Sequence, residues 1–381
     1  MRTMLKIIRL FLDYLLYELS GKTRAIPLQT VNNPAAPVHK SDSRFKVRED
    51  ASLTNESKTD EAQILLLGDL MCQRKQQLAC KKDSGYDFSG SFDAVKPLFN
   101  KADLVVGNLE TIVSHSLPNM DDCPFSEGLP HLNAPHEWLT AIREAGIDAL
   151  VSANNHNCDG GKNGILQTLQ NIRNAGIPVT GIFDGSEKKR YLLIDVNGIR
   201  VAVLAYATWY NFKDCYMSKK DRNTMLNLYS AAKAKKDIAA AKKDGADFVI
   251  TYMHWGIEYK HYVSKRQQKM AKQLVAAGCD LIAGSHVHVL QAFDYVNGKP
   301  CLYSFGNFIS SQTMDGTQDT VILNVNLKKE NGKTQACVSG IPCCTIVTKE
   351  DTDHHTVPVT KDSDPKAFNR IAAVLGNKLS I

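Results

Sequence analysis

From about residue 61 onward, the spacing of apolar residues alternates between a pattern typical of strands and a pattern typical of helices. Short apolar runs typical of strands alternate with longer stretches in which apolar residues recur at helical spacing. A glycine closely follows each helical stretch, as is common where a helix ends. We expect strands at 63–67, 103–106, 148–152, 248–252 and 281–284, and helices at 135–145, 164–175, 231–243 and 265–277. This alternation predicts an α/β fold.

Three Asn-Gly pairs separate β-rich segments, at Asn197-Gly198, Asn297-Gly298 and Asn331-Gly332. Asn-Gly favours the type I′ turn of a hairpin, because both central residues of that turn need positive φ. We therefore expect antiparallel strands in addition to parallel ones, and hence mixed sheets.

The N-terminal segment is apolar but interrupted by charges. Lys6, Arg9 and Asp13 are spaced by three and four residues, so on a helix they would form a narrow polar stripe beside a broad apolar surface. These interruptions argue against a cleavable signal sequence and against a membrane-spanning helix. Such a helix would pack on the protein itself or on a second subunit, or alternatively lie in a membrane interface.

Composition divides the chain into four parts. Segment 21–60 is rich in Pro, Asn, Ser and charged residues, which is typical of a solvated linker. We expect an amphipathic helix at 1–20, the linker at 21–60, the main domain at 61–350, and a C-terminal extension with a helix at 351–381.

The overall composition is that of an ordinary globular protein. The 381 residues are 43% hydrophobic and 23% charged, which excludes collagen-like, coiled-coil and wholly disordered classes. A net charge of +6 is too small and too dispersed to indicate a nucleic-acid partner. The ten cysteines lack zinc-ribbon spacing and several lie in apolar runs, which indicates free buried thiols in a reducing compartment. We expect a cytoplasmic protein, with a peripheral position at the inner membrane face as a further option.

Residues that can bind a metal are concentrated where the predicted strands end. In open α/β sheets the carboxyl ends of the strands converge on one crevice, so side chains distant in sequence can meet there. His286 and His288 are spaced to point the same way if the backbone is extended. The candidate ligands are Asp69, Asn108, Glu110, Asn155, His254, His286 and His288.

This candidate set contains carboxylates, amide oxygens and imidazoles, without a thiolate. Such ligands suit Mn, Fe or Zn ions better than a structural Cys-type zinc site. Seven candidates exceed the needs of one tetrahedral ion, which favours two divalent metal ions bridged by a carboxylate. Taken singly, Asp69 could be a satisfied turn residue and His254 a core imidazole.

Six ordered motifs carry a resemblance to a known family. They lie at 68–71, 107–110, 154–160, 254–256, 284–288 and 303–308. In this order they resemble the CapA-type capsule-synthesis (poly-γ-glutamate biosynthesis) proteins over residues 63–312, and that family is similar in turn to the calcineurin-like metallophosphoesterases. The resemblance implies an α/β four-layer sandwich of mixed sheets flanked by helices, metallophosphoesterase-like, around a dinuclear metal centre.

The resemblance also implies roles for the candidate residues. It makes Asp69 the first-strand ligand, Asn108 or Glu110 the bridging position, Asn155 the amide-oxygen ligand, and His254, His286 and His288 the remaining ligands. It makes His156 an acid or phosphate-binding residue that Asp159 could orient, although Asp159 could instead cap a strand end.

Two positions depart from the wider superfamily. Met71 stands where those phosphoesterases have histidine, and Asn108 stands where they have aspartate. A thioether is a poor ligand for hard divalent ions, and an amide lacks the carboxylate charge. One metal could therefore bind weakly, be lost, or recruit Glu110.

Two functions follow from the resemblance. The first is a divalent-metal-dependent hydrolase or transferase in the biosynthesis of a capsule, poly-γ-glutamate or another cell-surface polymer, acting on an anionic polymer or a phosphorylated glycan. The alternative is a non-catalytic capsule assembly or export factor that retains the same fold and docks on a membrane surface or a membrane synthase partner.

Overall fold

The computed structural model describes residues 59–115, 117–122, 131–348 and 354–381. The helix expected at 1–20 lies outside the described residues, as does almost all of the linker expected at 21–60. Both stay predictions.

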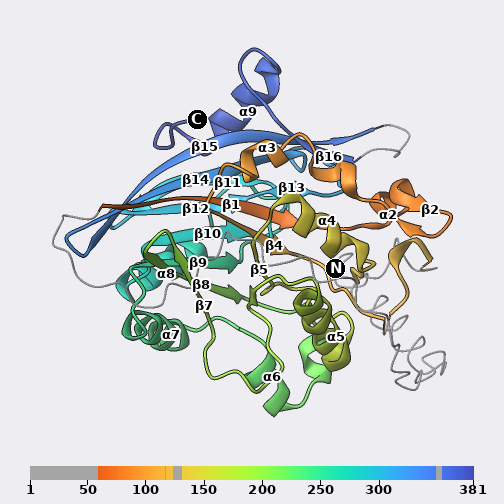
Figure 1. Ribbon diagram of the computed structural model, residues 1–381, viewed down its shortest axis with the longest axis horizontal. Coiled ribbons are helices and arrows are strands. Elements are labelled where there is room, and N and C mark those ends of the chain that lie inside the picture. Colours follow the sequence, from red (N-terminus) through yellow and green to blue (C-terminus); the bar gives the residue numbers. More distant parts are fainter. Residues whose placement is uncertain (1–58, 116, 123–130, 349–353) are drawn as a thin grey trace. The chain divides into compact units, whose positions relative to one another are not determined.

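The first sheet has eight strands, in the order β16-β15-β14-β1-β4-β5-β6, with the short β13 also paired to β1 (Figure 1). Strands β4, β5, β6 and β13 join the sheet in parallel, while β14, β15 and β16 are antiparallel to their neighbours. The strands are β1 (Asp60–Leu70), β4 (Leu104–Leu109), β5 (Ala149–Val151), β6 (Val179–Thr180), β13 (Asn307–Ile309), β14 (Asp319–Glu330), β15 (Lys333–Val347) and β16 (His354–Pro358).

The second sheet has six strands, in the order β11-β12-β10-β9-β8-β7. Its four inner strands are parallel, and β7 and β11 pair antiparallel at its two edges. The strands are β7 (Leu192–Val196), β8 (Ile199–Ala207), β9 (Phe248–His254), β10 (Leu281–Ser285), β11 (Leu290–Val296) and β12 (Lys299–Phe305). Both sheets are therefore mixed, as predicted.

The four predicted helices are present. Ser230 caps α7 (Ala231–Lys243), and Ser264 forms a capping box with Gln267 at the start of α8 (Lys265–Ala276). Gly146 adopts positive φ directly after α4. The remaining helices are α2 (Arg74–Cys80), α3 (Lys96–Phe99), α4 (Glu137–Ala145), α5 (Gly161–Asn174), α6 (Lys219–Met225) and α9 (Pro365–Leu375). Helices α7 and α8 match the predicted bounds within one residue, whereas α4 begins two residues later and α5 three residues earlier than predicted.

Short elements complete the described chain. Three 3₁₀ turns lie at Ser89–Phe92, Met120–Asp122 and Lys213–Tyr216, and a two-stranded hairpin is formed by β2 (Lys81–Lys82) and β3 (Gly85–Tyr86).

Three apolar cores lie between four layers. Leu66 of the first sheet and Val203 of the second belong to the core between the sheets. The adjacent Leu65 points to the opposite face of β1 and packs with Trp138 of α4 in a second core. Ile238 of α7 belongs to a third core on the outer face of the second sheet. The prediction of a four-layer α/β sandwich is confirmed.

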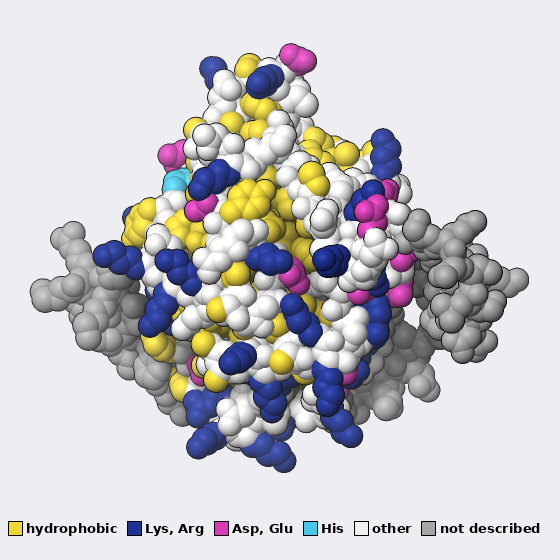
Figure 2. Space-filling view, turned by 90° about the vertical axis from the view of Figure 1, so that its left-hand side faces the viewer, with side chains coloured by type: hydrophobic (Ala, Val, Ile, Leu, Met, Phe, Trp, Pro, Cys, Tyr) yellow, Lys and Arg dark blue, Asp and Glu magenta, His cyan; other side chains and the backbone are white. Residues whose placement is uncertain are grey.

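The helices over the second sheet are amphipathic. Ile238 and Leu274 are buried beneath α7 and α8, while lysines such as Lys236 and Lys269 are exposed on their outer faces. Figure 2 shows Lys and Arg side chains gathered on the lower part of this side of the molecule.

The predicted hairpins are present at all three Asn-Gly pairs. Asn197, Asn297 and Asn331 have φ of 54°, 50° and 50°, and the glycine after each is also positive. Each pair joins antiparallel neighbours, β7 to β8, β11 to β12, and β14 to β15. The turn prediction is therefore confirmed.

The segment after residue 350 adds to the main domain. Strand β16 extends the first sheet through β15, and Ile371 and Leu375 of α9 belong to the core between the sheets. Arg370 also donates two hydrogen bonds to Asp319 of β14.

All nine described cysteines are free, as expected, and six of them are buried; the expectation of burial is wrong for Cys215 and Cys337, which are exposed. Within the described residues, no helix is both long and apolar enough to cross a membrane.

Candidate metal centre

Strand ends bring the candidate ligands together. In the register of the first sheet, Asp69 is opposite Asn108 on one side and Asn307 on the other. In the second sheet, His254 at the end of β9 pairs with Ser285 at the end of β10. The carboxyl ends of these buried apolar strands face one another, so the polar side chains that follow the strands meet in one place.

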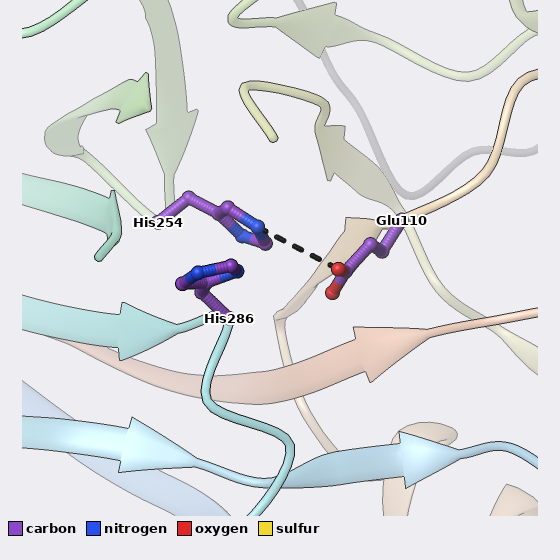
Figure 3. Close-up of side chains that lie close together, drawn as sticks. All are labelled: Glu110, His254 and His286. Carbon is purple, nitrogen blue, oxygen red and sulfur yellow. Dashed lines mark ion pairs between the residues drawn. The ribbon is translucent and has the colours of Figure 1, made fainter. Parts of the chain in front are cut away.

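Glu110, directly after β4, lies at the middle of the cluster. Its Oε1 is 3.5 Å from His254 Nε2 and 3.9 Å from His288 Nε2. Figure 3 shows Glu110 facing His254 and His286. Glu110 belongs to two groups of possible metal ligands, one with His254 and His286 and the other with Asp69 and His288. Within each group, the ligand atoms all lie within 4.8 Å of one another.

The Glu110 carboxylate is fully buried without a donor. No N–H or O–H group of the described residues donates to either of its oxygens. Burial and the neighbouring Asp69 carboxylate hold the pKa of Glu110 well above its ordinary value, and Asp69 is close enough to share a proton with it. A buried ionised carboxylate needs compensation, and a divalent cation supplies it. The donor set therefore fits a metal.

The imidazoles of the cluster are neutral, as metal ligands must be. Burial lowers the pKa of His286 to about 3 and holds the pKa of His254 well below its ordinary value. Among the described residues, His286 Nδ1 has no hydrogen-bond partner, whereas its Nε2 accepts from Trp209 Nε1 at 3.3 Å. In a neutral imidazole only one nitrogen lacks a proton, so His286 can bind an ion through Nδ1 only in the tautomer whose Nε2 carries the proton and no longer accepts from Trp209.

Neighbouring groups orient the other histidines. His254 Nδ1 is 3.0 Å from Ser285 Oγ, and His288 Nδ1 is 2.9 Å from Asn307 Oδ1. Such contacts with the second nitrogen determine which nitrogen faces a metal. Ser285 precedes His286 in the motif at 284–288, and Asn307 lies in the motif at 303–308.

The backbone of the His286–His288 segment differs from the extended form considered above. His286 has φ of 94° and His288 has φ of 61°, both left-handed. The His286 backbone N–H donates to Asp69 Oδ2 at 3.2 Å. The two histidines consequently join different ligand groups, rather than the same one.

Both candidate asparagines lie in the cluster. Asn108 Nδ2 donates to Asp69 Oδ1 at 2.7 Å, so its amide nitrogen faces that carboxylate. Asn155 Oδ1 is 2.7 Å from His254 Nε2. Met71 instead packs with Met120 and Leu132 in a small apolar cluster, the environment that its thioether favours.

His156, Asp159 and Lys213 form a chain of contacts beside the cluster. His156 Nδ1 is 2.8 Å from Asp159 Oδ2, and Lys213 Nζ donates to Asp159 Oδ1 at 2.7 Å. Burial alone would raise the pKa of Asp159, but Lys213 and His156 outweigh it and lower that pKa below its ordinary value. The ionised Asp159 also accepts from the Leu132 N–H at 2.6 Å, so it both orients His156 and holds a neighbouring loop.

Sequence reasoning missed Lys213, Trp209 and Ser285. Lys213 and Trp209 lie in the loop after β8, a strand whose end contributes no motif. That loop follows the carboxyl end of a parallel strand, where ligands commonly bind, and this position could have identified it as part of the site. Ser285 could have been identified from its place beside His286.

The model of the family described as bacterial capsule synthesis protein PGA_cap matches residues 63–312. The chain belongs to this family. All nine predicted site residues lie inside the matched segment, and so do Trp209, Lys213 and Ser285.

Two relatives of the PGA_cap chain are similar over most of the domain. The capsule biosynthesis protein CapA of Bacillus anthracis is 31% identical over 270 residues, which cover 71% of this chain and 64% of that protein. The PGA biosynthesis protein CapA of Bacillus subtilis (strain 168) is 31% identical over 270 residues, covering 69% and 67%. The match thus spans about two thirds of these relatives.

Among solved structures, the calcineurin-like phosphoesterase YfkN from Bacillus subtilis is similar at 15% identity with a TM-score of 0.47. The similarity covers 82% of this chain and 98% of that one.

Proposed function

We propose that this PGA_cap-family protein is a divalent-metal-dependent hydrolase of phosphate esters in the biosynthesis of a cell-surface polymer. The observation that carries the proposal is Glu110, a buried carboxylate without a donor that belongs to both ligand groups. A residue in this position suits the bridge between two ions.

The two groups of ligand atoms define where ions would bind. Glu110, His254 and His286 would hold one ion, and Asp69, Glu110 and His288 would hold the other. Asn155, whose amide oxygen lies beside His254, would add to the first. Bound divalent ions would supply Lewis acidity toward a phosphoryl oxygen.

The protein's own residues would orient the substrate and move a proton. Asp159 holds His156 through Nδ1, which leaves Nε2 to deliver a proton to the leaving oxygen. Contacts with Lys213 and His156 keep Asp159 ionised, so its carboxylate stays in place against the His156 ring.

The alternative is an assembly or export factor that binds without turnover. Asn108 favours this alternative, because its neutral amide donates a hydrogen bond to Asp69. A carboxylate at the same position would instead add a negative charge that attracts a metal ion. Met71 favours it as well, since its side chain is buried in an apolar cluster. The full set of Glu110, His156 and Asp159 contacts supports catalysis more strongly.

The cellular role is proposed from the family. Relatives named for capsule and PGA biosynthesis support a role in making or processing a cell-surface polymer. We infer that the substrate is an anionic polymer or a phosphorylated glycan, and that the protein acts near a membrane surface or a membrane synthase.

Metal analysis combined with a phosphodiesterase assay tests the proposal. Purified wild type should contain a divalent metal and hydrolyse bis-(p-nitrophenyl) phosphate, while His286→Ala should lose both metal and activity. Glu187→Gln is the matched control, because Glu187 pairs with Arg173 on the surface. Wild type that contains metal without turnover would support the assembly factor, and metal-free, inactive wild type would refute the metal centre.

A further inference from the structure

Five rings form a continuous row across the candidate metal centre. Phe212 contacts Trp209 with ring centroids 5.6 Å apart, and Trp209 contacts His286 at 6.0 Å. The row continues from His286 to His288 at 6.3 Å and from His288 to Tyr259 at 5.7 Å. Aromatic side chains thus border the two histidines at both ends.

The aromatic side chains at the two ends of the row are exposed to solvent. Phe212 is 71% exposed and Tyr259 is 38% exposed, although large apolar side chains are normally buried. Exposed aromatic groups beside a polar, buried cluster are typical of a binding surface rather than of a core.

The backbone at both positions is strained. Phe212 has φ of 61° and Tyr259 has φ of 62°, in the left-handed region that bulky residues avoid. The preceding Asn211, with φ of 51°, is of a type that tolerates this region. Bulky residues in this strained region cluster at ligand-binding sites, and at Tyr259 the backbone N–H also donates to the Val287 carbonyl at 2.7 Å.

Charge at the rim does not favour a polycarboxylate ligand. Lys213, next to Phe212, is paired with Asp159. Tyr259 lies between the half-buried acidic residue Glu258 and the exposed Lys260, so its immediate neighbours carry no excess of positive residues. A chain with a carboxylate on every unit would need surplus cations, whereas a ring with apolar C–H faces and hydroxyl edges matches amphipathic aromatic side chains.

We propose that Trp209, Phe212 and Tyr259 form an aromatic rim that binds a sugar ring adjoining the phosphate group of the substrate, which makes the substrate a phosphorylated glycan. This inference rests on the proposed function for the position of the phosphate. It adds the substrate class and three binding residues.

Binding of small probes by the full chain tests the rim. Glucose 1-phosphate and glycerol 1-phosphate carry the same phosphate and differ in the ring, while tri-γ-glutamate carries carboxylates without a ring. Calorimetry on wild type should give about tenfold tighter binding of glucose 1-phosphate than of the other two probes. Trp209 is half-buried, whereas Trp138 and Trp255 are fully buried, so its fluorescence should report the same binding.

Asparagine substitutions separate a binding role from a structural one. Phe212→Asn and Tyr259→Asn should reduce glucose 1-phosphate affinity to that of glycerol 1-phosphate, yet leave the melting temperature unchanged or higher, because asparagine tolerates positive φ. Tyr295→Asn is the control: Tyr295 is 47% exposed on β11 and its ring contacts Phe293, which is not part of the row, so its loss should leave affinity unchanged.

Several results would overturn the inference. Equal or tighter binding of glycerol 1-phosphate or tri-γ-glutamate by wild type would do so, as would unchanged affinity in both asparagine variants. Tighter binding of thymidine monophosphate than of glucose 1-phosphate would assign the rim to a nucleobase instead. Ring-selective binding by a wild type that shows no hydrolysis would support the rim while refuting the hydrolase, so the two failures are distinguishable.

Discussion

Replacing Glu110 with glutamine should have opposite effects on the metal-free and metal-bound protein. Without metal, the buried carboxylate receives no donor from the described residues, and its proton can only be shared with Asp69. A glutamine amide has the same shape and can donate to Asp69 without carrying charge. We therefore expect Glu110→Gln to stabilise the metal-free protein and to abolish the stabilisation by metal.

The expected magnitudes follow from burial. An unsatisfied buried polar group costs roughly 1–3 kcal/mol, and more when it is charged. Removing that cost should raise the melting temperature of the metal-free variant by about 2–8 °C. Metal at a hundredfold excess over its dissociation constant should stabilise wild type by about 2.7 kcal/mol and leave the variant nearly unchanged.

The pH dependence has a definite sign. Burial and Asp69 raise the pKa of Glu110 above its ordinary value of 4.5, so the folded protein favours the protonated form. A raised carboxyl pKa destabilises the folded state once pH exceeds the unfolded value. The advantage of the metal-free variant should accordingly be larger at pH 7 than at pH 4.

Thermal unfolding after chelation, repeated with Mn²⁺ added, measures both effects. Glu187→Gln serves as the control for loss of a carboxylate on the surface. The reasoning is refuted if Mn²⁺ raises the melting temperatures of wild type and Glu110→Gln equally, or if the chelated variant melts well below chelated wild type.

Three further predictions concern the residue that orients the proton donor, the core and a half-buried lysine. Asp159→Asn should slow phosphodiester hydrolysis about 10²–10⁴-fold at unchanged metal content; loss of metal from the variant would contradict its assignment beside the ions. Leu66→Ala should lower the free energy of unfolding in urea by about 2–5 kcal/mol, while Leu228→Ala, at a 48% exposed position, should change it by less than about 0.5 kcal/mol; similar effects would show that the core is misplaced. Burial lowers the pKa of Lys233 to about 8, so its charge destabilises the fold most below pH 8 and progressively less toward its ordinary value of 10.5. Lys233→Met should therefore raise the melting temperature at pH 7 more than at pH 10, and an equal gain at both would contradict the shift.

Much of the fold was predictable because its signals are local. The helix predicted at 231–243 is observed as α7 (Ala231–Lys243), and the three Asn-Gly turns form hairpins because asparagine and glycine accept positive φ. The predicted strand at 63–67 is longer in the structure, as β1 (Asp60–Leu70), because pairing with β14 and β13 extends it at both ends. Pairing partners distant in sequence are invisible to a local pattern.

The chemical types of the site were likewise readable from the sequence. Carboxylates, amides and imidazoles after apolar strands predict an ion-binding edge, whatever the register of the sheets. Sequence left open whether Asn108 or Glu110 takes the central position, and the register of β1 with β4 turns Asn108 toward Asp69 and leaves Glu110 within reach of both histidine groups.

Residue type and periodicity by themselves therefore determined which segments are strands and helices and which side chains can bind a metal, because those properties depend on near neighbours. Only the tertiary structure decided that Glu110 is shared, that His286 and His288 separate through left-handed backbone, and that Lys213 and Trp209 join the site. Those contacts join residues far apart in the chain, and their distances depend on how two sheets pack against each other.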